Sequence, residues 1–267
     1  MPAPSPYGDL DRPPLHPRAL SRALEPDGWR LLLLQEAAST NAVAAERVRA
    51  GEPGGLVVVA EAQTAGRGRL DRSWLSPPRA GLTFSVLVRP DLPAAQWSWL
   101  PLWTGLAVAT ALRERAGIDA VLKWPNDVVL GPGAGAPLAG RKVCGVLVEV
   151  PEPGAAVLGI GLNVTTAQEE LPHDGATSLR LAGARSTDRD TVLRAVLRAL
   201  TGVLADPGAA RAGYRERCST IGRRVRIELP GDRAVEGTAE AVDEAGRLVV
   251  DGTTYAVGDV VHLRPVS

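Results

Sequence analysis

The segment Leu56-Val57-Val58-Val59-Ala60, followed closely by Gln63-Thr64-Ala65-Gly66-Arg67-Gly68-Arg69, is the part of the sequence that most constrains the fold. The first stretch is apolar and rich in β-branched residues, which is typical of a buried strand. The second stretch places two glycines and two arginines in a loop after that strand. Guanidinium groups match a carboxylate or phosphate, so the pattern favours an anion-binding site at the end of a strand. Similar Gly-Arg loops also occur as solvated loops and in disordered RNA-binding tails.

Composition and charge indicate a globular protein. Of 267 residues, 45% are hydrophobic and 22% are charged, and the basic and acidic residues both number 30. The formal charge is therefore zero, which gives little support for binding duplex nucleic acid through bulk electrostatics. Cys144 and Cys218 are too few and too far apart for a disulfide framework or a paired-cysteine metal site. The N-terminal sequence has no secretory signal, and we expect a cytoplasmic protein.

The order of apolar segments predicts an α+β fold, in which a mixed β-sheet is covered by helices on one face. The predicted strands are residues 29–34, 56–60, 82–88, 121–124, 143–150 and 156–164. The predicted helices are residues 41–49, 100–115 and 191–204. The uncharged stretch 92–112 is interrupted by proline and glycine and predicts a buried helix instead of a membrane span.

Two ends of the chain differ from this central region. Six of the first 17 residues are proline, so residues 1–20 are predicted to form a tail that is mobile or draped over the surface. After residue 223, short β-rich runs at 225–229, 235–242, 248–250 and 255–263 are separated by turn signals and predict a small β-barrel. We therefore expect a large domain over residues 21–216 and a small one over 217–267.

Four further motifs accompany the arginine loop, and they are Ser39-Thr40-Asn41, Lys123-Trp124-Pro125-Asn126-Asp127, Gly140-Arg141-Lys142-Val143-Cys144-Gly145-Val146-Leu147-Val148-Glu149 and Gly159-Ile160-Gly161-Leu162-Asn163-Val164. In this order and spacing, the five motifs resemble the biotin protein ligase family. The resemblance implies a class II synthetase-like catalytic domain of the biotin and lipoate ligase type, with an SH3-like barrel after it. Residues 131–140 look like an insertion relative to that family. Only 38 residues precede Ser39, so we expect the monofunctional class without a DNA-binding domain.

The resemblance also implies an activity. Members of the family use ATP to convert biotin into biotinyl-5'-AMP and transfer biotin to a lysine of a biotin carboxyl carrier domain of acetyl-CoA or acyl-CoA carboxylase. We expect Mg²⁺ as cofactor without assigned protein ligands, although Asp127 could hold it through water. We expect a monomer or weak dimer that binds neither nucleic acid nor membrane.

The same resemblance assigns roles to individual residues. The catalytic set is Arg67, Arg69 and Lys142. The biotin-binding set is Ser39, Thr40, Asn41, Gln63, Gly66, Arg67, Gly68, Arg69, Trp74, Lys142 and Gly145. The nucleotide-binding set is Arg69, Arg72, Trp74, Asn126, Lys142 and Asn163. Leu70 and Asp71 depart from the basic or glycine residues frequent in relatives and make this loop less cationic.

The chemistry of these residue types is consistent with the assigned roles. Joining two anions requires fixed cations, whereas a neutral ureido ring requires hydroxyl and amide partners. Structural alternatives remain for several residues, because Ser39 or Thr40 can cap a helix, Asn126 can stabilise a turn and Trp74 or Trp124 can belong to a core.

Other classes of site find less support. The sequence contains neither a P-loop nor a dinucleotide-binding fingerprint. His16, His173 and His262 adjoin none of the motifs, so we do not expect histidine base catalysis. The alternatives that remain are a lipoate or octanoate transferase, which shares the fold, and a non-catalytic RNA-binding module that uses the arginine loop.

Overall fold

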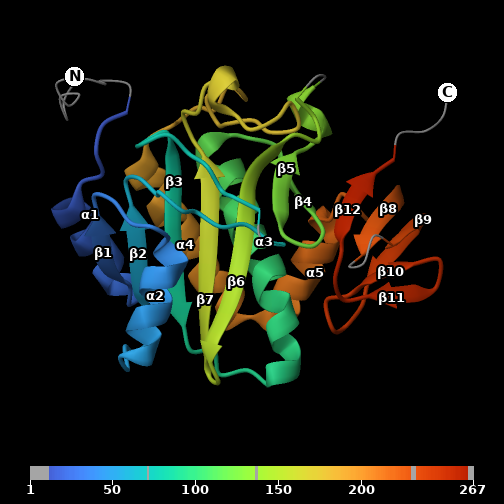
Figure 1. Cartoon of the computed structure of the whole chain (residues 1–267), viewed down its shortest axis with the longest axis horizontal. Coiled ribbons are helices and arrows are strands. Elements are labelled where there is room, and N and C mark those ends of the chain that lie inside the picture. Colours follow the sequence, from blue (N-terminus) through green and yellow to red (C-terminus); the bar gives the residue numbers. More distant parts are fainter. Residues whose placement is uncertain (1–11, 71, 136–137, 230–232, 264–267) are drawn as a thin grey trace.

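The computed structural model of the protein describes residues 12–70, 72–135, 138–229 and 233–263. These residues form a large sheet flanked by helices and a smaller antiparallel sheet at the C-terminal end (Figure 1). Asp71, for which a charge effect is expected, lies outside the described residues, as do residues 1–11 of the predicted tail.

The large sheet has seven strands in the order β1-β2-β3-β7-β6-β5-β4. Their bounds are β1 Arg30–Leu34, β2 Leu56–Ala60, β3 Gly81–Val88, β4 Ala120–Lys123, β5 Asp127–Leu130, β6 Lys142–Glu152 and β7 Ala155–Asn163. Only the β1–β2 pair is parallel among these strands, so the sheet is mixed, as predicted. The three longest strands, β3, β6 and β7, lie together at its centre.

Helices cover the two faces of the sheet unequally. The helices α1 Pro17–Leu24, α3 Leu100–Ala111, α4 Arg189–Ala205 and α5 Pro207–Arg217 contribute to one continuous core with the sheet. Val57 and Val59 of β2 point into this core, whereas Leu56 and Val58 pack with α2 Thr40–Arg49 on the opposite face. The expected helical layer on one face is present, and α2 adds partial cover to the other (Figure 1).

The elements predicted from the sequence lie within a few residues of the observed ones, but two α-helices and one strand of the large domain were not predicted. The strand β5 is only four residues long and directly follows a turn-like motif. The helix α5 contains two glycines and begins at a proline, and α1 also begins at a proline and buries only two leucines. Such segments give a weak periodic signal.

The described part of the predicted tail is anchored to the large domain. The amide of Leu15 donates to Glu61 Oε1 at 2.7 Å, and Arg189 donates to the carbonyl of Pro13 at 2.7 Å. Arg189 and Glu61 form a buried ion pair at 2.7 Å. Of the two predicted alternatives, these contacts favour a tail draped over the large domain from Arg12 onward, because its backbone groups find partners on Glu61 and Arg189.

The smaller sheet comprises β8 Arg224–Leu229, β9 Arg233–Val242, β10 Leu248–Val250, β11 Thr253–Tyr255 and β12 Asp259–His262, in the order β11-β10-β9-β8-β12. All its pairings are antiparallel. This arrangement agrees with the predicted SH3-like domain. The predicted strand 255–263 is in fact divided, since residues 256–258 turn between β11 and β12.

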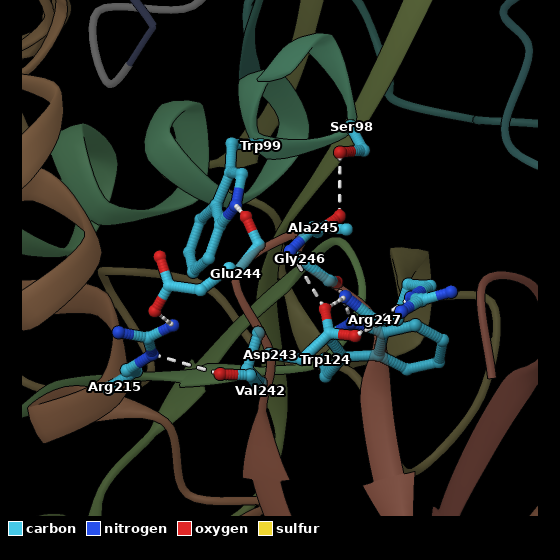
Figure 2. Close-up of polar contacts among 10 residues, drawn as sticks. All are labelled: Ser98, Trp99, Trp124, Arg215, Val242, Asp243, Glu244, Ala245, Gly246 and Arg247. Atoms are coloured by element: carbon cyan, nitrogen blue, oxygen red, sulfur yellow. Dashed lines mark hydrogen bonds and ion pairs between the residues drawn. The ribbon is translucent and has the colours of Figure 1, made fainter. Parts of the chain in front are cut away.

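The turn between β9 and β10 makes several of the contacts that join this C-terminal domain to the large one (Figure 2). Three successive carbonyls of the turn accept side-chain hydrogen bonds: Glu244 from Trp99 at 2.8 Å, Ala245 from Ser98 at 2.6 Å and Gly246 from Trp124 at 3.0 Å. Within the turn, Asp243 pairs with Arg247 at 2.7 Å, and on its outer side Arg215 pairs with Glu244 at 2.8 Å. Because indole N–H groups that are buried require acceptors, these contacts fix the position of the domain.

The stretch predicted as a buried helix is buried only from Trp99 onward, because residues 92–98 are exposed or half-buried. It forms a short 3-10 segment, Ala94–Trp99, followed by α3, whose residues are nearly all buried. Across the described ranges, no helix combines the length and apolar character needed to cross a membrane.

Candidate active site

A cavity of about 240 Å³ lies over the central strands, beneath the arginine loop. Among the residues that the structure describes, its wall includes every predicted site residue except Gly66. The predicted residues that line it are Ser39, Thr40, Asn41, Gln63, Arg67, Gly68, Arg69, Arg72, Trp74, Asn126, Lys142, Gly145 and Asn163. Residues far apart in the sequence thus converge on one place.

The floor of the cavity is a shelf of bare backbone. Gly145 on β6 is paired with Gly161 on β7, and the Trp74 indole lies directly over both. A Cβ at Gly161 would overlap the indole, and one at Gly145 would lie 3.0 Å from it. A glycine inside a strand marks a close approach of this kind. The two glycines therefore form a flat surface that suits a planar group. In this structure the Trp74 indole covers that surface.

One end of the cavity is polar and uncharged. Gln63 Oε1 accepts the Thr40 amide at 2.8 Å and the Thr40 hydroxyl at 3.1 Å, so Gln63 caps the first turn of α2. Ser39 is the N-cap residue of α2, but its own side chain makes no capping bond. Its hydroxyl therefore lies on the cavity wall without that structural task.

Asn41 differs from these residues, because its side-chain amide is engaged by the protein on both sides. Its nitrogen donates to Glu149 Oε2 at 2.6 Å and to the carbonyl of Leu147 at 3.2 Å. Its oxygen accepts from Ser85 at 2.6 Å. Both donors of the amide are thus used within the protein, while its oxygen retains capacity to accept a further hydrogen bond.

The arginine loop is a short hairpin. The Gly68 amide donates to the carbonyl of Arg72 at 2.6 Å, and the Trp74 amide donates to that of Gly66 at 2.9 Å. A side chain at Gly66 would overlap the carbonyl of Trp74, which explains why glycine is needed there. Gly66 thus contributes to the hairpin geometry and does not face the cavity.

The other end of the cavity is cationic, and its cations contact carboxylates of the protein. Lys142 pairs with Asp127 at 2.6 Å, and Arg72 pairs with Asp259. Nearer the polar end, Arg67 pairs at 3.0 Å with Glu149, which also accepts a hydrogen bond from Asn41. Lys142 also lies over the Trp74 ring, 5.6 Å from its centroid. A bound anion would therefore have to replace carboxylates that already neutralise these groups.

Burial alters the acid-base properties at this end. Desolvation lowers the pKa of Arg69 below its ordinary value, against the opposing effects of Asp259 and Asp127. Burial also lowers the pKa of Lys123, which is opposed by Asp127 and reinforced by Lys142. Clustered cations close to a cavity are typical of sites built for anionic ligands.

The two asparagines expected to bind a nucleotide both line the cavity, but they also bind the protein. Asn126 Oδ1 accepts from Arg69 at 3.1 Å, and its amide nitrogen donates to the carbonyl of Val146 at 2.9 Å. Asn163 is buried, and its nitrogen donates to the carbonyl of Thr177 at 3.0 Å. The predicted turn role of Asn126 is thus accompanied by a contact that orients Arg69.

Several lining residues were not predicted from the sequence. His173, which adjoins no motif in the sequence, lies on the wall in the structure. The loop after β7 returns to the cavity because Lys142 donates its amide to the carbonyl of Gly175 at 2.7 Å. Thr83 and Asp259 also line the cavity, and Asp259 comes from the C-terminal domain. Only tertiary contacts bring these residues to the site.

Comparison with known proteins agrees with this geometry. Residues 34–165 match the Biotin/lipoate A/B protein ligase family, and residues 220–263 match the Biotin protein ligase C terminal domain. The biotin--[acetyl-CoA-carboxylase] ligase of Mycobacterium tuberculosis is 43% identical, and the alignment covers 96% of this chain and 98% of that protein. The chain belongs to the biotin protein ligase family.

Other biotin protein ligases resemble the chain over most of its length. The bifunctional ligase/repressor BirA of Escherichia coli is 30% identical over 84% of this chain and 70% of that protein. The structure of biotin protein ligase from Aquifex aeolicus in complex with biotin and ATP is 31% identical, with a TM-score of 0.72, and the alignment covers 88% of this chain and 98% of that chain. The Leishmania major ligase in complex with biotinyl-5-AMP is 26% identical, with a TM-score of 0.60, and the alignment covers 88% and 98% of the two chains.

Proposed function

We propose that the protein adenylates biotin with ATP and transfers biotin from biotinyl-5'-AMP to a lysine of a biotin carboxyl carrier domain. The observation that carries this proposal is that one cavity is lined both by uncharged polar side chains, those of Ser39, Thr40 and Gln63, and by the cations Arg69, Arg72 and Lys142. A neutral ureido ring and a chain that ends in a carboxylate require both environments. The Aquifex aeolicus structure, which contains biotin and ATP, supports the same pair of substrates.

In the first step, a carboxylate oxygen of biotin attacks the α-phosphorus of ATP, and the bond to pyrophosphate breaks. Two anions must approach each other, and negative charge builds up on the phosphoryl oxygens. Lys142, Arg69 and Arg72 supply the opposing charge, and Lys142 exchanges Asp127 for the ligand. Ser39, Thr40 and Gln63 would hold the ureido ring and so fix the distance between the reacting atoms.

In the second step, the uncharged amine of the carrier lysine attacks the acyl carbon of biotinyl-AMP. The acyl–oxygen bond breaks, AMP leaves, and the new amide loses one proton. The hairpin that bears Arg67 and Arg69 covers the cavity between the two steps, so we infer that it retains the adenylate until the carrier arrives.

Mg²⁺ would shield the phosphates of ATP. The described residues contain no cluster of three His, Cys, Asp or Glu side chains suited to a metal ion. Asp127 is the wall carboxylate that a phosphate-bound Mg²⁺ could approach once Lys142 turns to the ligand. This donor set suits an ion that is held mainly by substrate phosphates and water.

The carrier partner is expected to be the biotin domain of a carboxylase in the cytoplasm. The name of the Mycobacterium tuberculosis relative supports acetyl-CoA carboxylase as the class of partner. A lipoate tail would place an apolar dithiolane against Thr40 and Gln63, which favours biotin as the substrate.

Incubation with ATP, Mg²⁺ and radiolabelled biotin tests the proposal. We expect protein-bound biotinyl-AMP and stoichiometric pyrophosphate, followed by label on an added carrier domain. Parallel reactions with lipoate should give no adenylate, and titration with RNA should give no salt-sensitive binding. Adenylation of lipoate in preference to biotin, or no ATP consumption with either acid, would contradict the proposed function.

A further inference from the structure

The C-terminal domain places a carboxylate at the cationic end of the cavity. Asp259, the first residue of β12, lies on the cavity wall with its side chain 18% exposed. It pairs with Arg72 through Oδ2 and lies 3.8 Å from Arg69 Nη1 through Oδ1. The preceding carbonyl, that of Gly258, accepts from both terminal nitrogens of Arg69 at 3.4 Å. Two arginines of the hairpin are therefore held by one short segment of another domain.

A carboxylate is an unexpected neighbour for a site that binds two anions, because it repels both of them. Its presence is reasonable if it organises the cations. The hairpin has few internal hydrogen bonds, and the side chain of Arg72 is 65% exposed. Long exposed side chains sample many rotamers, so a fixed counter-charge reduces the entropy that is lost when the hairpin closes on a ligand.

The position of Asp259 is itself well determined. It is paired with Glu228 of β8, and Gly258 packs so closely on Ile227 that a side chain at residue 258 would collide with it. The domain that carries β12 is fixed to the large domain through the turn that contains Gly246 (Figure 2). Trp124 of the catalytic domain thus contacts the same small domain that carries Asp259.

We propose that Asp259 is a positioning residue that holds Arg69 and Arg72 at the mouth of the cavity, so that the C-terminal domain completes the active site. This inference rests on the proposed function, since it concerns the closure of the hairpin over biotinyl-AMP. Asp259 acts through the two arginines and does not touch the reacting atoms.

The test compares Asp259→Asn with the unmodified protein, because asparagine keeps the shape and removes the charge. In the ligand-free protein, hydrogen exchange at the amides of Gly68 and Trp74 should become faster. With ATP and biotin, the KM for ATP and the dissociation rate of biotinyl-AMP should each rise by about tenfold, as for a lost hydrogen bond to a charged group. Asp259→Glu should restore part of both effects.

Glu236→Gln is the matched control. Glu236 lies in the same small sheet, on β9, and pairs only loosely with Arg224 and Arg226, at 3.9 and 3.7 Å. This variant should exchange, bind and react as the unmodified protein does. Arg72→Gln breaks the proposed pair from the hairpin side and reports on it even if Asp259→Asn folds poorly. Because both act on one pair, the double variant should lose no more than the more severe single variant.

Three results would overturn the inference. The first is tighter ATP binding by Asp259→Asn, which would make Asp259 a competitor of the ligand. The second is an additive loss in the double variant. The third is unchanged hydrogen exchange together with unchanged retention of biotinyl-AMP. A failure of the proposed function gives a different pattern, because the unmodified protein and Glu236→Gln would then form no biotinyl-AMP, whereas the exchange experiment needs no catalysis.

Discussion

Replacing Lys142 with methionine should abolish most of the adenylation activity while leaving the fold intact. Methionine keeps the apolar stem that packs beside Gly145 and Trp74, and removes the ammonium group that lies 2.6 Å from Asp127. Two opposite charges about 4 Å apart interact by roughly 4 kcal/mol at an effective dielectric constant of about 20. The Lys142 side chain is 29% exposed, so screening reduces this value. We expect a loss of about a hundredfold to a thousandfold in the rate of biotinyl-AMP formation.

Part of this loss should come from Asp127, which becomes an unpaired negative charge in a site for anions. The double variant Lys142→Met with Asp127→Asn should therefore recover roughly tenfold of the lost rate. The assay is single-turnover release of radiolabelled pyrophosphate, with thermal unfolding as the control for folding. A single variant that retains the rate of the unmodified protein within about threefold would refute this electrostatic account.

Three further predictions concern closure, docking and pH. Arg69→Gly removes the contacts with Asn126 and Asp259, so biotinyl-AMP should escape and label bystander proteins; blots for biotin on added albumin that match the unmodified protein would contradict this. Trp124→Phe leaves the Gly246 carbonyl without its donor and should lower the free energy of unfolding by about 1–3 kcal/mol, measured by denaturant titration beside Trp97→Phe, whose indole bonds within the large domain. Burial, aided by Lys123 and Arg223, lowers the pKa of His262 to about 4. As the pH falls below about 6.5, His262 therefore binds a proton in the unfolded chain before it does so in the folded protein. Stability should fall by about 1–2 kcal/mol between pH 6.5 and 4, and His262→Gln should remove that fall in thermal melts.

The sequence was sufficient to predict the sheet and most of the cavity wall. Runs of β-branched residues identified the central strands, and the ordered motifs identified the polar end and the hairpin. The glycine on β6 was recognisable as a site of close approach, because glycine is unfavourable inside a strand. Its partner on β7 becomes meaningful only with the register that pairs Gly145 with Gly161.

The contributions from other parts of the chain could not be predicted in this way. His173 belongs to an exposed loop without any motif, and Asp259 stands in a short strand of a different domain. Both reach the cavity through contacts that depend on how domains and loops pack. Composition left open whether residues 12–15 are mobile or draped over the surface, since it does not reveal that Glu61 and Arg189 offer partners to a proline-rich backbone.

The docking turn has a consequence for exchanging parts between enzymes of this architecture. The three hydrogen bonds that this turn accepts from the large domain go to main-chain oxygens, so the side chains of Glu244 and Ala245 matter little to these bonds. The chemical requirement lies in the donors of the large domain, which are the indoles of Trp99 and Trp124 and the hydroxyl of Ser98. The C-terminal domain of a distant relative could therefore be grafted onto this catalytic domain if its turn between β9 and β10 has the same curvature. Comparing such a chimera with the unmodified protein would measure how much an acidic residue opposite Arg69 and Arg72 adds to the turnover rate.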